Sequence, residues 1–212
     1  MPLEPNEIVA FLIAVSFAAG LNVSGTVAVL GLMARFGVLE LPGDLDLLAS
    51  WWVIGGAGVL FLVEVVADKI PLFDLIWNVL QTFVRVPTAA LLAYAATPSL
   101  DPGWQLAATG LGATLALTAH TLKTTLRTAV TASPEPASNI ALSLTEDVIA
   151  LGLTWFAATY PWVAAAIVLV LVTVAVVVLR LLWRGARRLL GAQQVPQRSQ
   201  QDAGRKRLRQ DE

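Results

Sequence analysis

The sequence predicts an all-α fold, a polytopic transmembrane helix bundle of about six spans, each about 20 residues long. Hydrophobic residues make up 57% of the 212 residues and charged residues only 14%, whereas soluble domains carry about 25% charged residues. The mean hydropathy is +0.72. We expect residues 1–184 to form an integral membrane helical domain and residues 185–212 to form a basic, disordered cytoplasmic tail.

The first apolar stretch, Ile8 to Met33, is long enough to cross a bilayer. Its middle, residues 20–25, reads GLNVSG and combines two glycines with Asn22 and Ser24. The simpler interpretation is a close helix–helix contact, because small residues let backbones approach and Asn or Ser can bond across helices. The alternative is a broken or re-entrant helix whose freed backbone groups line a site.

The second span opens at Trp51 and ends in a charged segment, residues 64–74, that also contains Pro71. Charged groups at membrane depth cost several kcal/mol unless they are paired or hydrated, so this segment is a functional candidate. Proline disfavours helical geometry at the preceding residue, and we therefore expect a turn at Pro71. After it, Asp74 and Arg85 fall on one face of a third helix, at positions i and i+11.

The fourth span begins at Trp104 and changes character after Ala119. His120, Lys123 and Arg127 follow at i, i+3 and i+7, a spacing that places them in one polar stripe. The fifth span, Ile140 to Tyr160, carries Glu146 and Asp147 in its first turns, and the sixth, 163–182, is almost uninterrupted Val, Leu and Ala.

The basic residues are segregated along the chain. Nine of the fourteen Lys and Arg residues lie at or after Arg180, which predicts a multi-pass protein of the cell membrane with a cytoplasmic C-terminus. Six spans, an even number, put both termini on the same side of the membrane, so the N-terminus is also expected in the cytoplasm. The acidic loops 35–50 and 97–103 then lie outside.

This topology brings the charged groups of several spans to the cytoplasmic half of the bundle. Near balance of charge favours one buried network, because an unpaired buried charge costs far more than a paired one. We expect Glu64 and Asp68, one turn apart, to face Lys123 and Arg127. The candidate ion- or ligand-binding residues are Glu64, Asp68, Lys69, Asp74, Arg85, His120, Lys123, Arg127, Glu146 and Asp147.

Two segments carry a resemblance to a known family. Residues 66–87 read VADKIPLFDLIWNVLQTFVRVP and residues 133–147 read SPEPASNIALSLTED. In these segments the chain resembles the uncharacterised membrane family known as domain of unknown function 4126, over about residues 8–182. The resemblance implies a multi-span bacterial-type membrane protein and supplies no activity.

Two functions remain open. The first is a small transporter or channel-like carrier for an ion, a small solute or a phosphate-bearing lipid, in which the charged cluster contacts the substrate. The second is a structural or assembly protein, in which the cluster is an internal salt-bridge network that fixes helix register.

Other functions are disfavoured by what the sequence lacks. There is no cysteine and a single histidine, so we expect neither a metal site nor a cofactor. An intramembrane enzyme would have to use His120 with Glu146 or Asp147 as its acid/base pair, and we expect no catalytic residues. The expected partners are the lipid bilayer and, for the basic tail, anionic head groups. An oligomer is compatible with the sequence, and nucleic acid is not expected.

Overall fold

The computed structural model describes residues 3–68, 71–131 and 136–208, and these residues form helices joined by turns, without strands. This confirms the predicted all-α fold. The chain divides into two compact units, Met1–Val172 and Thr173–Glu212. The elements are α1 (Pro5–Arg35), the short 3₁₀ helix η1 (Leu45–Ala49), α2 (Trp51–Ala67), α3 (Pro71–Ala95), α4 (Pro102–Thr131), α5 (Pro136–Thr159) and α6 (Pro161–Leu208).

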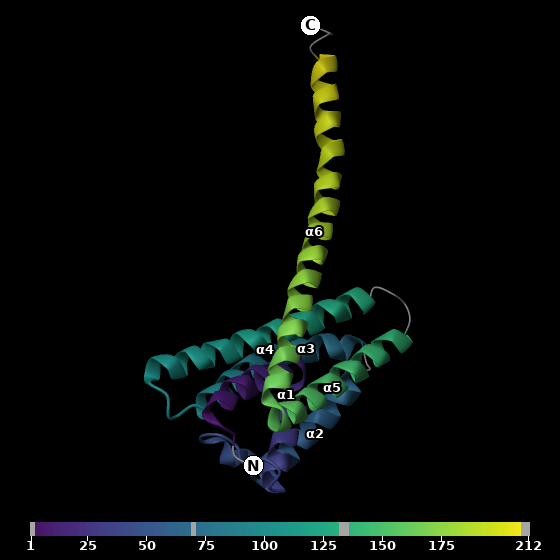
Figure 1. Cartoon of the computed structure of the whole chain (residues 1–212). Helices are drawn as coiled ribbons and strands as arrows, with labels where there is room; N and C mark the ends of the chain where they lie inside the picture. Colours follow the sequence, from purple (N-terminus) through teal and green to yellow (C-terminus); the bar gives the residue numbers. More distant parts are fainter. Residues whose placement is uncertain (1–2, 69–70, 132–135, 209–212) are drawn as a thin grey trace. The chain divides into compact units, whose positions relative to one another are not determined.

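Helix α1 is the central element of the first unit. It packs against α2, α3, α4 and α5, and Figure 1 shows these helices around it. In its most apolar window 83% of the residues are buried, against 39% for α5. A helix that is apolar on all sides is stable only when neighbouring helices or lipid cover every face, and here neighbouring helices do so.

Helix α1 folds back on itself at Asn22, whose φ of −150° and ψ of 97° are not helical. Near its start, Val9 lines a small cavity together with Thr97. Beyond its end, the amide of Asp44 donates a 2.7 Å hydrogen bond to the carbonyl of Ala95. A straight helix of this length would separate its ends by about 46 Å, at about 1.5 Å per residue, yet both flanks reach the turn between α3 and α4.

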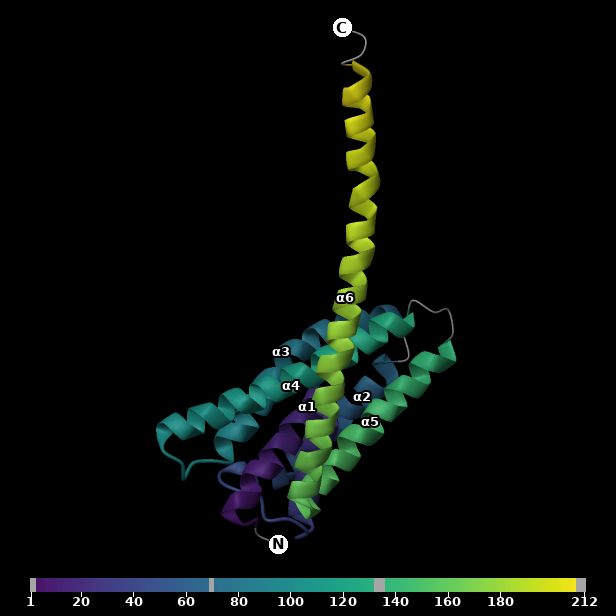
Figure 2. The same cartoon turned by 45° about the horizontal axis from the view of Figure 1, so that its top comes forward.

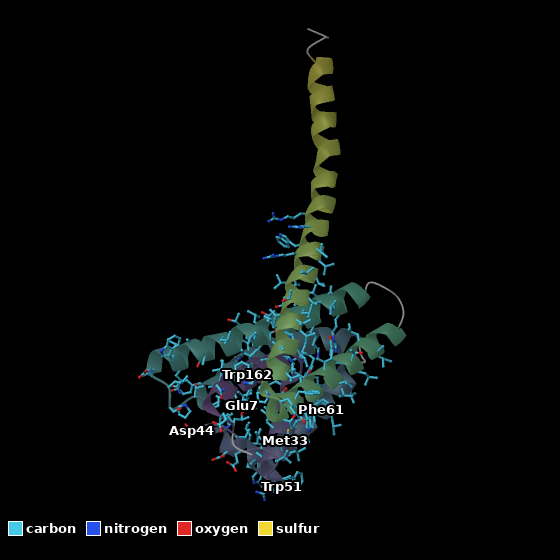
Figure 3. All side chains as sticks on the ribbon, in the orientation of Figure 1. Glu7, Met33, Asp44, Trp51, Phe61 and Trp162 are labelled. Carbon is cyan, nitrogen blue, oxygen red and sulfur yellow. The ribbon has the colours of Figure 1, made fainter. Side chains whose placement is uncertain are left out.

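The figures agree with these contacts. Figure 3 places Glu7, near the start of α1, and Met33, near its end, at the same end of the unit. The turned view in Figure 2 shows α1 beside α2 and α5, with which it is in contact. The structure therefore contains the broken, re-entrant form of the first apolar stretch.

The fold-back corrects the predicted topology. Parity with six straight spans placed the N-terminus on the side opposite loops 35–50 and 97–103, but the structure puts all three at one end of the unit. The physical reason is that α1 enters and leaves at the same end. The acidic N-terminus, which carries Glu4 and Glu7, therefore shares an end with two acidic loops.

Three helical segments in the described part of the chain are long and apolar enough to cross a membrane: Asn6–Arg35, Ile140–Thr159 and Pro161–Gly185. Shorter apolar segments are Trp51–Ala67 and Val79–Ala95. The polar stripe of α4, His120, Lys123 and Arg127, lowers the hydropathy of this helix, and its side chains are buried. Length and composition thus indicate a membrane protein.

Close contacts between backbones hold α1 against its neighbours. A Cβ built at Gly20 would lie 2.7 Å from Cα of Ala116 and 2.8 Å from Cβ of Ala119, both in α4. At Gly25 it would lie 2.8 Å from Leu151 in α5. The glycines that flank Asn22 are therefore packing residues, so residues 20–25 combine both predicted roles, close contact and helix break.

The second unit is described by itself. Helix α6 continues through it to Leu208, where the sequence predicts a disordered tail from residue 185. Leu, Ala, Arg and Gln dominate this stretch, and all of them have high helix propensity. The guanidinium of Arg187 lies 5.0 Å from the ring centre of Trp183, one helical turn away, in a cation–π contact.

Candidate functional site

The break in α1 is organised by the side chain of Asn22. A helix that starts anew leaves its first amides without intrahelical acceptors, and Asn22 Oδ1 accepts a 2.8 Å hydrogen bond from the amide of Gly25. Asparagine is a preferred residue at this capping position. The other end of the same side chain, Nδ2, donates a 2.8 Å hydrogen bond to Oδ1 of Asp147 in α5. Asn22 therefore joins the break to a buried carboxylate.

The first half of α1 ends in two carbonyls that accept hydrogen bonds from cations. Arg85 of α3 donates to the carbonyl of Gly20 at 3.3 Å, and Lys123 of α4 donates to the carbonyl of Leu21 at 3.2 Å. The carbonyl end of a helix carries a partial negative charge. Two buried side chains from different helices thus satisfy the backbone groups that the break sets free.

Lys123 is the centre of the cation–carboxylate network. Its Nζ lies 3.4 Å from Glu64, 3.6 Å from Asp68 and 3.4 Å from Glu146. Its side chain is completely buried. A single ammonium group therefore links carboxylates from α2, its C-terminal cap and α5.

Two arginines complete the network. The guanidinium of Arg85 forms an ion pair with Glu64, and both side chains are fully buried. Arg127 lies 2.9 Å from Glu146 and also pairs with Asp68. Asp68 caps the C-terminus of α2, and its Oδ2 accepts a 3.1 Å hydrogen bond from the hydroxyl of Ser143 in α5. The predicted pairing of Glu64 and Asp68 with Lys123 and Arg127 is confirmed.

His120 occupies the edge of the network next to Arg85. The distance from its Nδ1 to Nη1 of Arg85 is 3.2 Å, and that from its Nε2 to the Thr82 hydroxyl is 2.7 Å. Arginine has only donors, so Nδ1 accepts and the hydrogen of a neutral ring is on Nε2, which donates to Thr82. The hydrogen-bond partners of the His120 ring are thus Thr82 and Arg85, and neither Glu146 nor Asp147 is among them.

The described network contains more acids than bases. The acids Glu64, Asp68, Glu146 and Asp147 share the interior with the bases Arg85, Lys123 and Arg127. One oxygen of each acid, namely Glu64 Oε2, Asp68 Oδ1, Glu146 Oε1 and Asp147 Oδ2, has no hydrogen-bond partner in the described part of the chain. Unpaired buried charge costs several kcal/mol, so this excess of one acid is a feature to be explained.

Two cavities lined in part by the first half of α1 have a different character. One, of about 410 Å³, is lined by apolar side chains of α1, α4 and the start of α6, including Ile13, Leu115 and Trp162. The other, of about 50 Å³, is lined mainly by apolar groups around Val9 and Leu12. Neither wall contains a charged side chain, so the charged network is the candidate functional site.

The model of the family called domain of unknown function (DUF4126) matches residues 9–181. The chain belongs to the DUF4126 family. This confirms the resemblance seen in residues 66–87 and 133–147. No curated protein and no solved structure matches this DUF4126 chain.

Most of the predicted site residues of this DUF4126 protein come together in space. Eight of the ten form the network just described: Glu64, Asp68, Arg85, His120, Lys123, Arg127, Glu146 and Asp147. Lys69 and the side chain of Asp74 lie outside the described part of the structure. Whether the eight bind an ion or a ligand stays a prediction.

Sequence reasoning missed three contributors to the network. Thr82 and Ser143 were not singled out, although each lies one helical turn from a predicted residue, Arg85 and Asp147 respectively, and this spacing is the available signal. For Asn22 the sequence predicted either a bond across helices or a break, but it did not predict Asp147 of α5 as the partner. No local pattern connects residue 22 to residue 147, since the contact depends on how α1 packs against α5.

Proposed function

We propose that this protein is a small membrane carrier for a proton or another small ion or solute, and that the charged network at the break of α1 is its transport site. The observation that carries the proposal is the interrupted helix at Asn22. The carbonyls that it frees bind the buried cations Arg85 and Lys123. Carriers commonly build their sites from discontinuous helices, because the backbone groups at the break can contact ions.

The energetic cost of the network supports a functional role. Seven charged side chains are buried among the described helices. Replacing a buried ion-pair network by apolar residues of similar volume is often neutral or stabilising by about 1–4 kcal/mol. A chain that needed only stability would therefore be expected to carry leucine at these positions.

The burial of the arginines favours a small substrate over a lipid head group. The side chains of Arg85 and Arg127 are 0% and 7% exposed, and each is already paired with a carboxylate. A phosphate-bearing lipid would have to displace these carboxylates and bring a bulky group into the bundle. A proton or a small ion requires neither.

The fold-back of α1 supports a revised topology for the carrier. We place the acidic N-terminus and loops 35–50 and 97–103 outside, with α2 to α6 crossing the membrane and the C-terminus in the cytoplasm. This arrangement puts the basic C-terminus in the cytoplasm, as the positive-inside rule predicts. It also puts the acidic N-terminus and the two acidic loops together on the outer side. The charged network then lies toward the cytoplasmic end of α2 and α3.

The test is ion flux in proteoliposomes that contain the purified full-length chain. Currents are recorded on a solid-supported membrane after concentration jumps of H⁺, Na⁺ or K⁺. We expect a current for at least one of these ions that falls at least tenfold in Lys123→Met and is unchanged in Asp46→Asn, a matched charge removal at an exposed site in η1. A folded wild type with no current above that of empty liposomes for all three ions would refute the proposal of an ion carrier.

A structural role is the second candidate, and one observation favours it. Each of the cations Arg85, Lys123 and Arg127 is paired with a carboxylate from another helix, as expected for a network that fixes helix register.

A charge swap discriminates between the two candidates. The double variant Asp68→Arg with Arg127→Asp exchanges the two ends of one ion pair. If the swap restores stability but not ion flux, the site is functional. If the swapped protein retains both stability and cellular function, the network is architectural.

A further inference from the structure

The first part of helix α6 is uncharged over a length that matches the core of a bilayer. Residues 161–179 contain no charged side chain, and as a helix they measure about 29 Å at about 1.5 Å per residue. The hydrocarbon core of a bilayer is about 30 Å thick. In the most apolar window of the segment Pro161–Gly185 only 17% of the residues are buried, so we expect lipid chains around it. Arg180, the first charged residue, then comes at the level where the head groups begin.

Three arginines share one face of α6 at this level. Arg180, Arg184 and Arg187 stand at i, i+4 and i+7, within an arc of about 60° for 3.6 residues per turn. All three are exposed, and Figure 3 shows blue nitrogen atoms on one side of α6. Along the axis they cover about 10 Å, against about 5–8 Å for the head-group layer of one leaflet. Because long basic side chains can bend toward that layer, all three can reach it.

Trp183 is on the same side of the helix and marks the interface. Its side chain is 62% exposed, and indole rings are enriched at the boundary between lipid chains and head groups. The guanidinium of Arg187 lies over this ring, 5.0 Å from its centre. A guanidinium in this position contacts the ring with its face, while the N–H groups at its edge remain able to donate. The contact therefore holds Arg187 near the interface and leaves donors for a ligand.

Helix α6 provides no carboxylate close to these arginines. Between Asp147 and Asp202 the sequence contains no Asp or Glu, and Asp202 is about 22 Å beyond Arg187 along a helix with a rise of about 1.5 Å per residue. The arginines of the charged network differ in both respects, since Arg85 and Arg127 are buried and paired with carboxylates. The exposed face of α6 is thus suited to an anion from outside the helix.

We propose that the face of α6 formed by Arg180, Trp183, Arg184 and Arg187 is a binding site for the phosphate of an anionic phospholipid. The guanidinium groups donate hydrogen bonds to the phosphate oxygens in the forked geometry that suits this group, and the indole packs at the top of the acyl chains. Basic clusters that directly follow a span attract anionic lipids in this way. The site uses no residue of the charged network, so it does not depend on the proposed carrier function.

The geometry asks for more than a signal for membrane orientation. That signal depends on the number of Lys and Arg residues near the end of a span, and either residue serves. Here the three cations are all arginine, on one face, beside an exposed tryptophan. Recognition of phosphate by two parallel hydrogen bonds requires the fork of arginine, which lysine lacks. Exchange of arginine for lysine therefore separates the two roles.

The test is native mass spectrometry of the full-length protein in detergent micelles, titrated with phosphatidylglycerol or with phosphatidylcholine of the same acyl chains. The fraction of protein that retains one lipid gives an apparent Kd. Phosphatidylglycerol has a net negative charge and phosphatidylcholine has none. We expect the wild type to prefer phosphatidylglycerol by about tenfold or more, since each basic residue at a membrane surface contributes about fivefold. This comparison needs no variant.

Two triple variants test the arginine face. Arg180→Gln, Arg184→Gln and Arg187→Gln together should weaken phosphatidylglycerol binding by about tenfold or more. Lysine at the same three positions keeps the charge and the orientation signal but removes the fork, and we expect a loss of about threefold or more. All three residues are exposed, so we expect both variants to fold, which circular dichroism verifies.

A matched control removes three positive charges nearer the end of the chain. The variant Arg205→Gln, Lys206→Gln and Arg207→Gln should bind phosphatidylglycerol within about twofold of the wild type, because these residues lie far beyond the head-group layer along a helix with a rise of about 1.5 Å per residue. The control separates a site at the end of the span from attraction of lipid to the basic tail as a whole.

The proposal is overturned if the wild type does not prefer phosphatidylglycerol over phosphatidylcholine. It is also overturned if the tail control loses as much affinity as the glutamine variant, since net charge would then explain binding. Equal affinity of the lysine variant and the wild type would show that charge without the arginine fork is enough, and would reduce the face to an orientation signal. None of these results depends on whether the protein carries an ion current.

Discussion

Removing the charge of Lys123 should destabilise the protein, and a second substitution should recover part of the loss. Lys123→Met keeps a side chain of similar length and eliminates the ammonium group that lies 3.4–3.6 Å from Glu64, Asp68 and Glu146. It also removes the donor to the carbonyl of Leu21. Glu64, Asp68 and Glu146 thus all lose the same cation. The lysine side chain has no solvent exposure, so water does not replace it.

The size of the effect follows from which partners remain. Breaking a buried ion pair by removing one member typically costs about 3–5 kcal/mol. Glu64 still has Arg85, while Asp68 and Glu146 still have Arg127. None of these three carboxylates is left without a cation, so we expect a loss near the lower limit, about 3 kcal/mol of unfolding free energy.

Glu64→Gln added to Lys123→Met returns the balance between acids and bases to that of the wild type. We therefore expect the double variant to be less destabilised than the sum of the single variants, by a coupling energy of about 1–3 kcal/mol, as for other contacting charged residues. Reversible unfolding in mixed micelles, followed by circular dichroism, measures all four corners of the cycle. Single effects that add to within about 0.5 kcal/mol would refute a direct ion pair, since independent sites behave in this way.

Two further predictions concern the fold of α1. Gly20→Ala should destabilise the protein by about 1–3 kcal/mol, the usual cost of overpacking, because the new methyl group would meet the α4 backbone. The control is Gly55→Ala, whose methyl group would have nothing within 4 Å. In thermal unfolding, this control should be neutral or slightly stabilising. Because the sequence has no cysteine, Glu4→Cys and Asp46→Cys can each be labelled with a membrane-impermeant maleimide, and the fold-back predicts that both react from the same side of the membrane. Reaction from opposite sides would exclude a re-entrant α1.

Several parts of the site follow from local sequence alone. Helical periodicity puts His120, Lys123 and Arg127 on one face, and the structure buries that face. The same periodicity places Glu64 and Asp68 one turn apart, where they meet the lysine and the arginine of α4. These contacts were predictable because buried charges in an apolar chain must pair with opposite charges. The acids at the end of α2 and the bases in the polar stripe of α4 provide most of these charges.

Other parts depend on the arrangement of the helices. The sequence showed that residues 20–25 could be a contact or a break, and only packing decided that they are both. Gly20 touches α4 while Asn22 reaches α5. Whether the N-terminus shares an end with loop 35–50 also depended on this break, since one residue outside helical geometry reverses the direction of α1.

By itself, the amino-acid sequence determined that this protein is an apolar, all-helical membrane protein of the DUF4126 family with charged residues on the inner faces of its helices. Such properties follow from composition and from the 3.6-residue period of the helix, which are local. The tertiary structure decided which charges are paired and that Asp147 has, among the described residues, only an amide for a partner. The paired charges are up to 59 positions apart in the chain, and Asn22 and Asp147 are 125 positions apart, and packing of whole helices, not local pattern, fixes such distances.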